Sequence, residues 1–163
     1  MSQTLLAIGA HYDDCVFGIP GILLQAVAKD YRVVVLALIG DYTDWPPAKG
    51  RSAQLLEVSR NLAHFHGVEM RFLDFASGRY HVNEQTKLAV AKVVADVKPD
   101  IAFMLWHHDR HPDHEAASAL SKIALRQAGS ILGDERVKAP RQIYTTTMAP
   151  ATPSASSQTL SSR

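Results

Sequence analysis

Short continuous apolar runs alternate along the chain with longer stretches of helical periodicity. The runs at residues 5–9 and 32–39 are the clearest, and the second is rich in β-branched side chains, as expected of strands buried on both faces. Further strands are predicted at residues 69–73, 100–105 and 142–147, and helices at residues 16–29, 52–66, 83–97 and 114–128.

Near-continuous apolar strands separated by helices predict an α/β fold. We expect a Rossmann-like three-layer sandwich, with a mostly parallel sheet and helices on both faces. Residues 1–148 are assigned to one such domain. Residues 149–163 form a Ser/Thr/Pro/Ala-rich tail without apolar periodicity, which is expected to be disordered or loosely docked and is interpreted as a truncated or altered C-terminus.

Composition and charge exclude several classes of protein. Apolar residues make up 47% and charged residues 20%, which is ordinary for a globular domain. The formal net charge is +1 and the basic residues are scattered, so a nucleic-acid partner is not expected. One cysteine cannot form an internal disulfide or a Cys-rich zinc site. Neither a signal peptide nor a membrane span is predicted, which makes the cytoplasm the expected location. The sequence leaves association into a homo-oligomer open.

A first polar cluster follows the first predicted strand. It contains His11, Asp13 and Asp14, and histidine and carboxylate groups are suitable ligands for zinc and for harder divalent metals. Because neighbouring side chains diverge, one carboxylate can bind a metal while the other reaches the metal-bound water. The alternative is a polar strand-to-helix turn in which an aspartate caps the helix.

A second cluster, at residues 107–114, follows the predicted strand at 100–105 and contains four histidines and two aspartates. With Pro112 in the first helical turn, His111 and His114 can face the same side, which suits one metal ligand and one catalytic imidazole. The alternative is a solvated histidine-rich loop. In proteins with parallel sheets, ligands bind at the carboxyl ends of the strands. Both clusters follow such strand ends, so the topology can bring them together.

Taken together, the two clusters resemble the motifs of the PIG-L/LmbE-like family of zinc-dependent N-acetyl-sugar deacetylases. That family has Ala-His-Pro-Asp-Asp-Glu after its first strand and His-Pro-Asp-His much later. Here residues 10–15 read Ala-His-Tyr-Asp-Asp-Cys, and residues 111–114 read His-Pro-Asp-His. The resemblance extends roughly over residues 5–128.

The resemblance implies a role for each matching residue. It identifies His11, Asp14 and His114 as metal ligands, Asp13 as the general base, and His111 as the imidazole that stabilises the oxyanion. Three protein ligands leave one coordination position for water, as a catalytic zinc site requires. The implied cofactor is Zn²⁺, although other divalent transition metals also suit these ligands.

The implied function is a zinc-dependent hydrolase that removes an N-acetyl or similar acyl group from an amino-sugar conjugate or a related small molecule. Two departures from the motif bear on it. Tyr12 replaces the usual proline, which is expected to loosen the turn, and Cys15 replaces the usual glutamate, which affects support of the ligands or substrate choice. The alternatives are a non-catalytic metal-binding module that lacks the C-terminal pocket and a nucleotide-binding α/β domain without metal.

Overall fold

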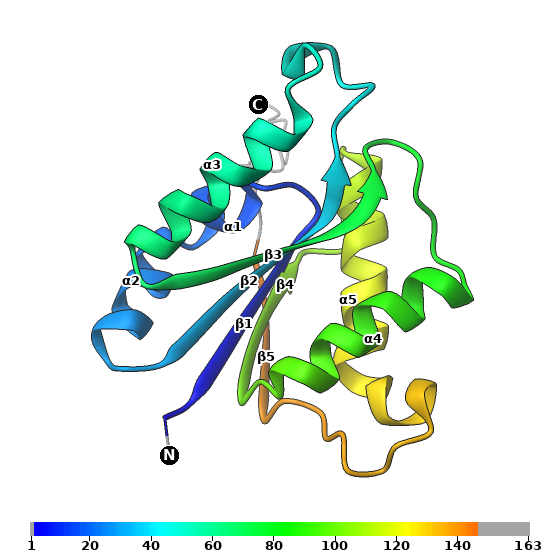
Figure 1. Ribbon diagram of the computed structural model, residues 1–163. Helices are drawn as coiled ribbons and strands as arrows, with labels where there is room; N and C mark the ends of the chain where they lie inside the picture. The colour runs from blue at the N-terminus through cyan, green and yellow to red at the C-terminus, as the bar shows by residue number, and fades with distance from the viewer. Residues whose placement is uncertain (1, 147–163) are drawn as a thin grey trace, which may run out of the picture.

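The computed structural model describes residues 2–146, which contain one five-stranded sheet (Figure 1). Its strands are β1 (Thr4–Gly9), β2 (Arg32–Asp41), β3 (Val68–Ala76), β4 (Ile101–Leu105) and β5 (Gln142–Thr146). They lie in the order β3-β2-β1-β4-β5, and every neighbouring pair is parallel. Thr147, predicted to end the last strand, and the predicted tail at 149–163 lie outside the described residues.

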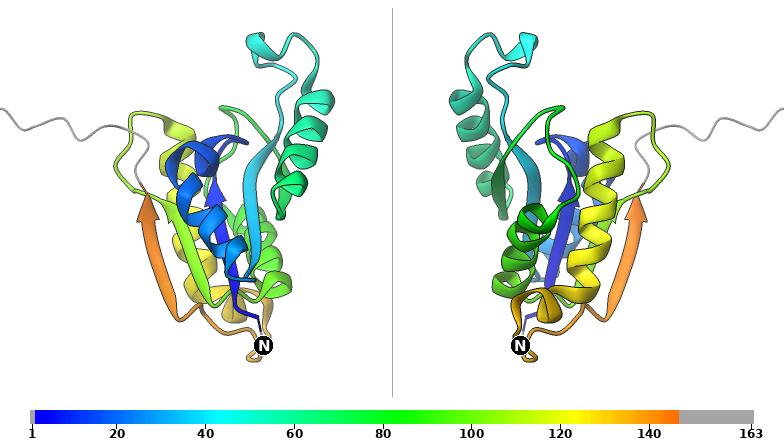
Figure 2. Two further views of the ribbon diagram at one scale, coloured as in Figure 1. Left: turned by 90° about the vertical axis from the view of Figure 1, so that its left-hand side faces the viewer. Right: turned by 90° about the vertical axis from the view of Figure 1, so that its right-hand side faces the viewer.

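Helices cover both faces of the sheet, so the three-layer α/β prediction is confirmed (Figures 1 and 2). On one side lie α1 (Asp14–Gly18), α2 (Pro20–Ala28) and α3 (Ser52–Phe65), and on the other lie α4 (Glu84–Val97) and α5 (Pro112–Leu132). A short 3-10 helix, η1 (Pro46–Ala48), lies between β2 and α3. None of the helices within residues 2–146 is both long and apolar enough to cross a membrane.

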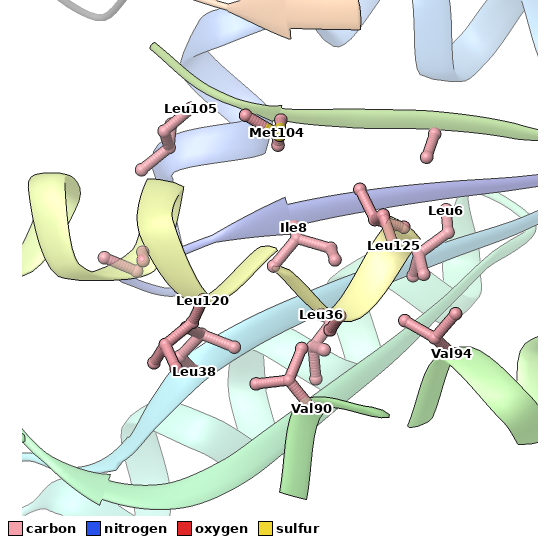
Figure 3. Packing of buried hydrophobic residues seen from close by; sticks show 14 of the residues in the cluster. Leu6, Ile8, Leu36, Leu38, Val90, Val94, Met104, Leu105, Leu120 and Leu125 are labelled. Carbon is pink, nitrogen blue, oxygen red and sulfur yellow. The ribbon is translucent and has the colours of Figure 1, made fainter. Parts of the chain in front are cut away.

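The apolar core is divided by the sheet into two clusters, because successive side chains of a strand point to opposite faces. Leu6, Ile8, Leu36 and Leu38 pack against α4 and α5 (Figure 3). Their neighbours along β1 and β2 face the other way and pack against α1 and α2; they are Leu5, Ala7, Val33 and Val35. Burial on both faces explains why β1 and β2 are continuous apolar runs.

Local signals set the ends of the two helices that cover one face. Asn83 accepts a hydrogen bond from the backbone N–H of Thr86, whose hydroxyl accepts the N–H of Asn83, forming a capping box at the start of α4. Pro112 occupies the first turn of α5, where a missing N–H costs nothing, and Gly133 ends that helix with φ 66°. This helix begins two residues before the predicted start at His114 and also ends later, at Leu132.

The predicted helix at residues 16–29 is wrong in one respect, because the structure has two helices there. They meet at Ile19, whose φ of −140° and ψ of 39° lie outside the helical region. Pro20 follows directly, and a proline disfavours helical geometry in the residue before it. The break separates α1 from α2. The side chains of Asp14 and Cys15, at the start of α1, lie beside Gly9 at the end of β1.

Candidate metal centre

The two polar clusters meet because β1 and β4 are neighbours in the sheet. Ile8 pairs with Met104, so the two strands end side by side. After β1 the chain adds β2 and β3 on one side of the sheet and then crosses to place β4 on the other. Such a topological switch point is where open α/β sheets form their ligand crevice. The expectation that the topology brings the clusters together is confirmed.

Three side-chain atoms form a compact triangle at this point. The His11 Nδ1 atom lies 3.2 Å from His114 Nε2 and 3.5 Å from Asp14 Oδ1, and the third edge, His114 Nε2 to Asp14 Oδ1, is 3.3 Å. Ligand atoms about 2.1 Å from a tetrahedral zinc ion lie about 3.4 Å from one another. The triangle therefore has the size that a divalent ion requires, and its donor chemistry fits such an ion.

Asp14 is held in place by the backbone that precedes it. Its Oδ2 atom accepts the N–H groups of Ala10 and His11 at 2.7 and 2.9 Å, which leaves Oδ1 directed at the two imidazoles. Burial alone would raise the pKa of this carboxyl, but hydrogen bonds from His11 and His114 outweigh burial and hold the pKa well below its usual range. Gly9 makes room, since a Cβ there would lie 2.8 Å from the Asp14 Cβ.

Each imidazole of the triangle has a second carboxylate at its outer nitrogen. His11 Nε2 lies 3.3 Å from Asp113 Oδ2, and His114 Nδ1 lies 3.0 Å from Asp109 Oδ2. The second contact is a close ion pair rather than a linear hydrogen bond. Burial disfavours the protonated form of His114, but its contacts with Asp14 and Asp109 outweigh burial and raise its pKa to about 9.

Asp13 lies at the N-cap position of α1, yet its side chain makes no capping hydrogen bond. The alternative interpretation of this cluster, in which an aspartate side chain caps the helix, therefore does not hold for Asp13. Burial raises the pKa of Asp13, and the negative charge of Asp14 beside it acts in the same direction. The structure thus leaves this carboxylate free of the helix end, close enough for the charges of His11 and His114 to act on it, and its role as a base stays a prediction.

His111 borders the triangle at the start of α5. The centre of its ring lies 4.8 Å from that of His11 and 4.9 Å from that of His114. The backbone N–H of Asp113 donates to His111 Nδ1 at 3.2 Å, so the neutral ring has its proton on Nε2. Burial lowers the pKa of this histidine, and the charges of the two neighbouring imidazoles lower it further.

Asp109 and Asp113 received no role from sequence reasoning. Asp113 is 3% exposed and also accepts the backbone N–H of Gly78 at 3.0 Å, which ties the segment after β3 to the start of α5. The hydroxyl of Tyr80 donates to the Asp113 carbonyl and strengthens this link. The available signal was the presence of two carboxylates inside the histidine cluster, but their spacing does not indicate which ring each one contacts.

The backbone of Tyr12 is linked to Tyr42, and the expectation of a looser turn stays a prediction. Its backbone N–H donates to the hydroxyl oxygen of Tyr42 at 3.1 Å, a bond that a proline cannot make. The two rings also pack edge to face, with centres 5.6 Å apart, and Tyr42 in turn contacts Trp45. Cys15 is buried between α1 and the sheet as a free thiol and is not part of the triangle.

Comparison with known proteins agrees with this architecture. Solved structures with a similar fold include 4-carboxy-2-hydroxymuconate hydratase (GalB) from Pseudomonas putida, with a TM-score of 0.73, 20% identity and 86% of this chain covered. They also include a conserved protein from Thermus thermophilus, with a TM-score of 0.77, 24% identity and 91% of this chain covered. A third is N,N'-diacetylchitobiose deacetylase from Pyrococcus horikoshii, with a TM-score of 0.75, 18% identity and 91% of this chain covered. The matched regions make up 64%, 68% and 62% of those proteins, respectively.

The family assignment rests on a separate match. The model of the PIG-L family, described as GlcNAc-PI de-N-acetylase, matches residues 6–125. This range begins within β1 and ends within α5, so it includes both polar clusters and every residue of the triangle. The chain therefore belongs to the PIG-L family.

Proposed function

We propose that the protein is a metal-dependent N-deacetylase that removes an N-acetyl or similar acyl group from an amino-sugar conjugate or a related small molecule. The observation that supports it most directly is the donor triangle of His11, Asp14 and His114, which His111 borders. Asp13 immediately precedes Asp14 in the chain. The family description as a de-N-acetylase supports the reaction class. Zinc is the proposed ion, because two imidazoles and one carboxylate are ligands that it accepts.

His11, Asp14 and His114 would hold the ion and leave one coordination position open. The chemistry that a zinc ion supplies in such a site, when bound, is Lewis acidity, which polarises a carbonyl and makes water reactive near neutral pH. The chain prepares the three ligands for this task. Backbone N–H groups hold Asp14, and carboxylates lie at the outer nitrogens of both histidines.

Asp13 and His111 would perform the proton transfer and the stabilisation of charge. Asp13 takes a proton from the attacking water and later delivers it to the nitrogen of the leaving amine. Its raised pKa makes the carboxylate a better proton acceptor. His111 donates a hydrogen bond from its Nε2–H group to the oxygen on which negative charge develops. Its Nδ1 atom is not available for this, because it accepts the Asp113 N–H.

Replacement of Asp13 by asparagine tests the base. We expect Asp13→Asn to retain zinc and to lose about 10²- to 10⁴-fold in rate of acetate release from N-acetylglucosamine derivatives. Asp44→Asn is the matched control, because Asp44 is an exposed carboxylate that pairs with Arg79. Full activity of Asp13→Asn would remove Asp13 from the mechanism.

The same assay separates the deacetylase from its alternatives. Fold alone does not decide the reaction, as the similarity to a hydratase illustrates. Tightly bound zinc without release of amine from any amide tested would favour a non-catalytic metal-binding module. Water addition to an unsaturated acid without amide hydrolysis would favour a hydratase. Failure to bind zinc, together with no stabilisation on adding it, would favour a nucleotide-binding domain.

A further inference from the structure

The carboxylate of Asp109 contacts both His111 and His114 at the start of α5. Asp109 lies in the segment between β4 and α5, and its side chain is 16% exposed. Its Oδ1 atom accepts the backbone N–H of His111 at 2.9 Å, and its Oδ2 atom lies 3.0 Å from Nδ1 of His114. The two oxygens therefore act on two different residues, one through the backbone and the other through the ring.

The contact with His114 determines which ring nitrogen faces the metal. A carboxylate at Nδ1 favours the form in which Nδ1 is protonated, so the lone pair of Nε2 remains available. Nε2 is the nitrogen that lies 3.2 Å from His11 Nδ1 and 3.3 Å from Asp14 Oδ1. The ring is thus held from both sides in the orientation and tautomer that a metal ligand needs.

We propose that Asp109 is a positioning residue that presents Nε2 of His114 to the metal and, through the same side chain, holds the turn that carries His111. This inference rests on the proposed metal site. Carboxylates behind metal-binding histidines typically contribute about 10- to 100-fold to metal affinity. Asp113 has a comparable position behind His11, but it also holds Gly78, so its replacement would disturb the fold as well.

Asp109→Asn separates the two contacts of this side chain. The amide oxygen of asparagine can still accept the His111 N–H, so the turn is retained. Its NH₂ group would then face Nδ1 of His114 as a donor, which favours the opposite tautomer, with the proton on Nε2. Asp134→Asn is a matched control, because Asp134 accepts the backbone N–H of Arg136 in the same two-residue pattern at the far end of α5.

The experiment measures zinc affinity by chelator competition from pH 6 to pH 9 and compares the proton-independent dissociation constants, because zinc binding displaces a proton from its histidine ligands. We expect the dissociation constant to rise about 10- to 100-fold in Asp109→Asn and to stay within about twofold in Asp134→Asn. Urea unfolding of the metal-free proteins verifies that both variants are folded. Asp109→Ser, whose hydroxyl can accept the His111 N–H without reaching His114, should show the same loss of affinity and serves if the asparagine variant fails to fold.

A spectroscopic signature distinguishes positioning from a purely structural role. In the zinc-bound protein the Nδ1–H proton of His114 should exchange slowly with water, because Nδ1 is buried beside the Asp109 carboxylate, and this protection should be reduced in Asp109→Asn. Unchanged zinc affinity in folded Asp109→Asn or Asp109→Ser would overturn the proposal. Because zinc affinity is measured without turnover, weakened binding in a chain that hydrolyses no amide would reject the deacetylase alone.

Discussion

A proton and the metal ion should compete for His114. Contacts with Asp14 and Asp109 outweigh the effect of burial and raise the pKa of this histidine to about 9, so the metal-free protein has a protonated His114 at pH 7. The proton supplies positive charge between two carboxylates. Zinc requires the lone pair of Nε2, and its uptake must therefore release this proton.

The size of the effect follows from the pKa. At pH 7, about two pH units below this pKa, protonation costs about 100-fold, or about 2.7 kcal/mol, of apparent zinc affinity. The raised pKa of His114 also sets the direction in which zinc affinity changes with pH. Protonation opposes binding at every pH below about 9, so apparent affinity rises as the pH rises, by about tenfold per unit between pH 6 and pH 8.

Chelator competition at pH 6, 7 and 8, with a chelator of known protonation constants, measures this slope. Calorimetry at pH 6.5 in two buffers of different ionisation enthalpy counts the released protons, and we expect about one from His114. Asp109→Asn removes one of the two carboxylates that raise the pKa of His114. The zinc affinity of this variant should therefore rise less steeply between pH 6 and pH 8. Affinity that is constant from pH 6 to pH 8, without proton release, would refute this reasoning.

Two substitutions test the packing around the triangle. Tyr12→Pro removes the N–H that the buried Tyr42 hydroxyl accepts, and we expect a loss of about 1–3 kcal/mol in the free energy of unfolding by urea. Tyr12→Phe retains that N–H, so an equal loss in both variants would argue against the bond. Gly9→Ala places a Cβ 2.8 Å from the Asp14 Cβ, and we expect about 1–3 kcal/mol of destabilisation together with weaker zinc binding. Wild-type zinc affinity in folded Gly9→Ala would show that Asp14 does not depend on this space.

Much of the fold could be predicted because its strands are unusually uniform. The buried middle of each of β1 and β2 is continuously apolar, which burial on both faces of a parallel sheet explains. The break at Ile19 was missed although Pro20 signalled it, because the flanking residues continue an apolar helical pattern. The helix predicted from His114 begins two residues earlier in the structure, at Pro112, which agrees with the placement of this proline in the first helical turn.

The sequence by itself determined which donor groups the candidate site contains, because residue types and their order along the chain are local properties. The family resemblance of two motifs predicts His11, Asp14 and His114 as ligands, with Asp13 and His111 beside them, and these roles stay predictions. Only the tertiary structure decided that atoms of the first three form a triangle with edges of 3.2–3.5 Å. It also decided that Asp109 lies behind His114. The physical reason is that these distances depend on the parallel pairing of β1 with β4, a contact between segments far apart in the sequence.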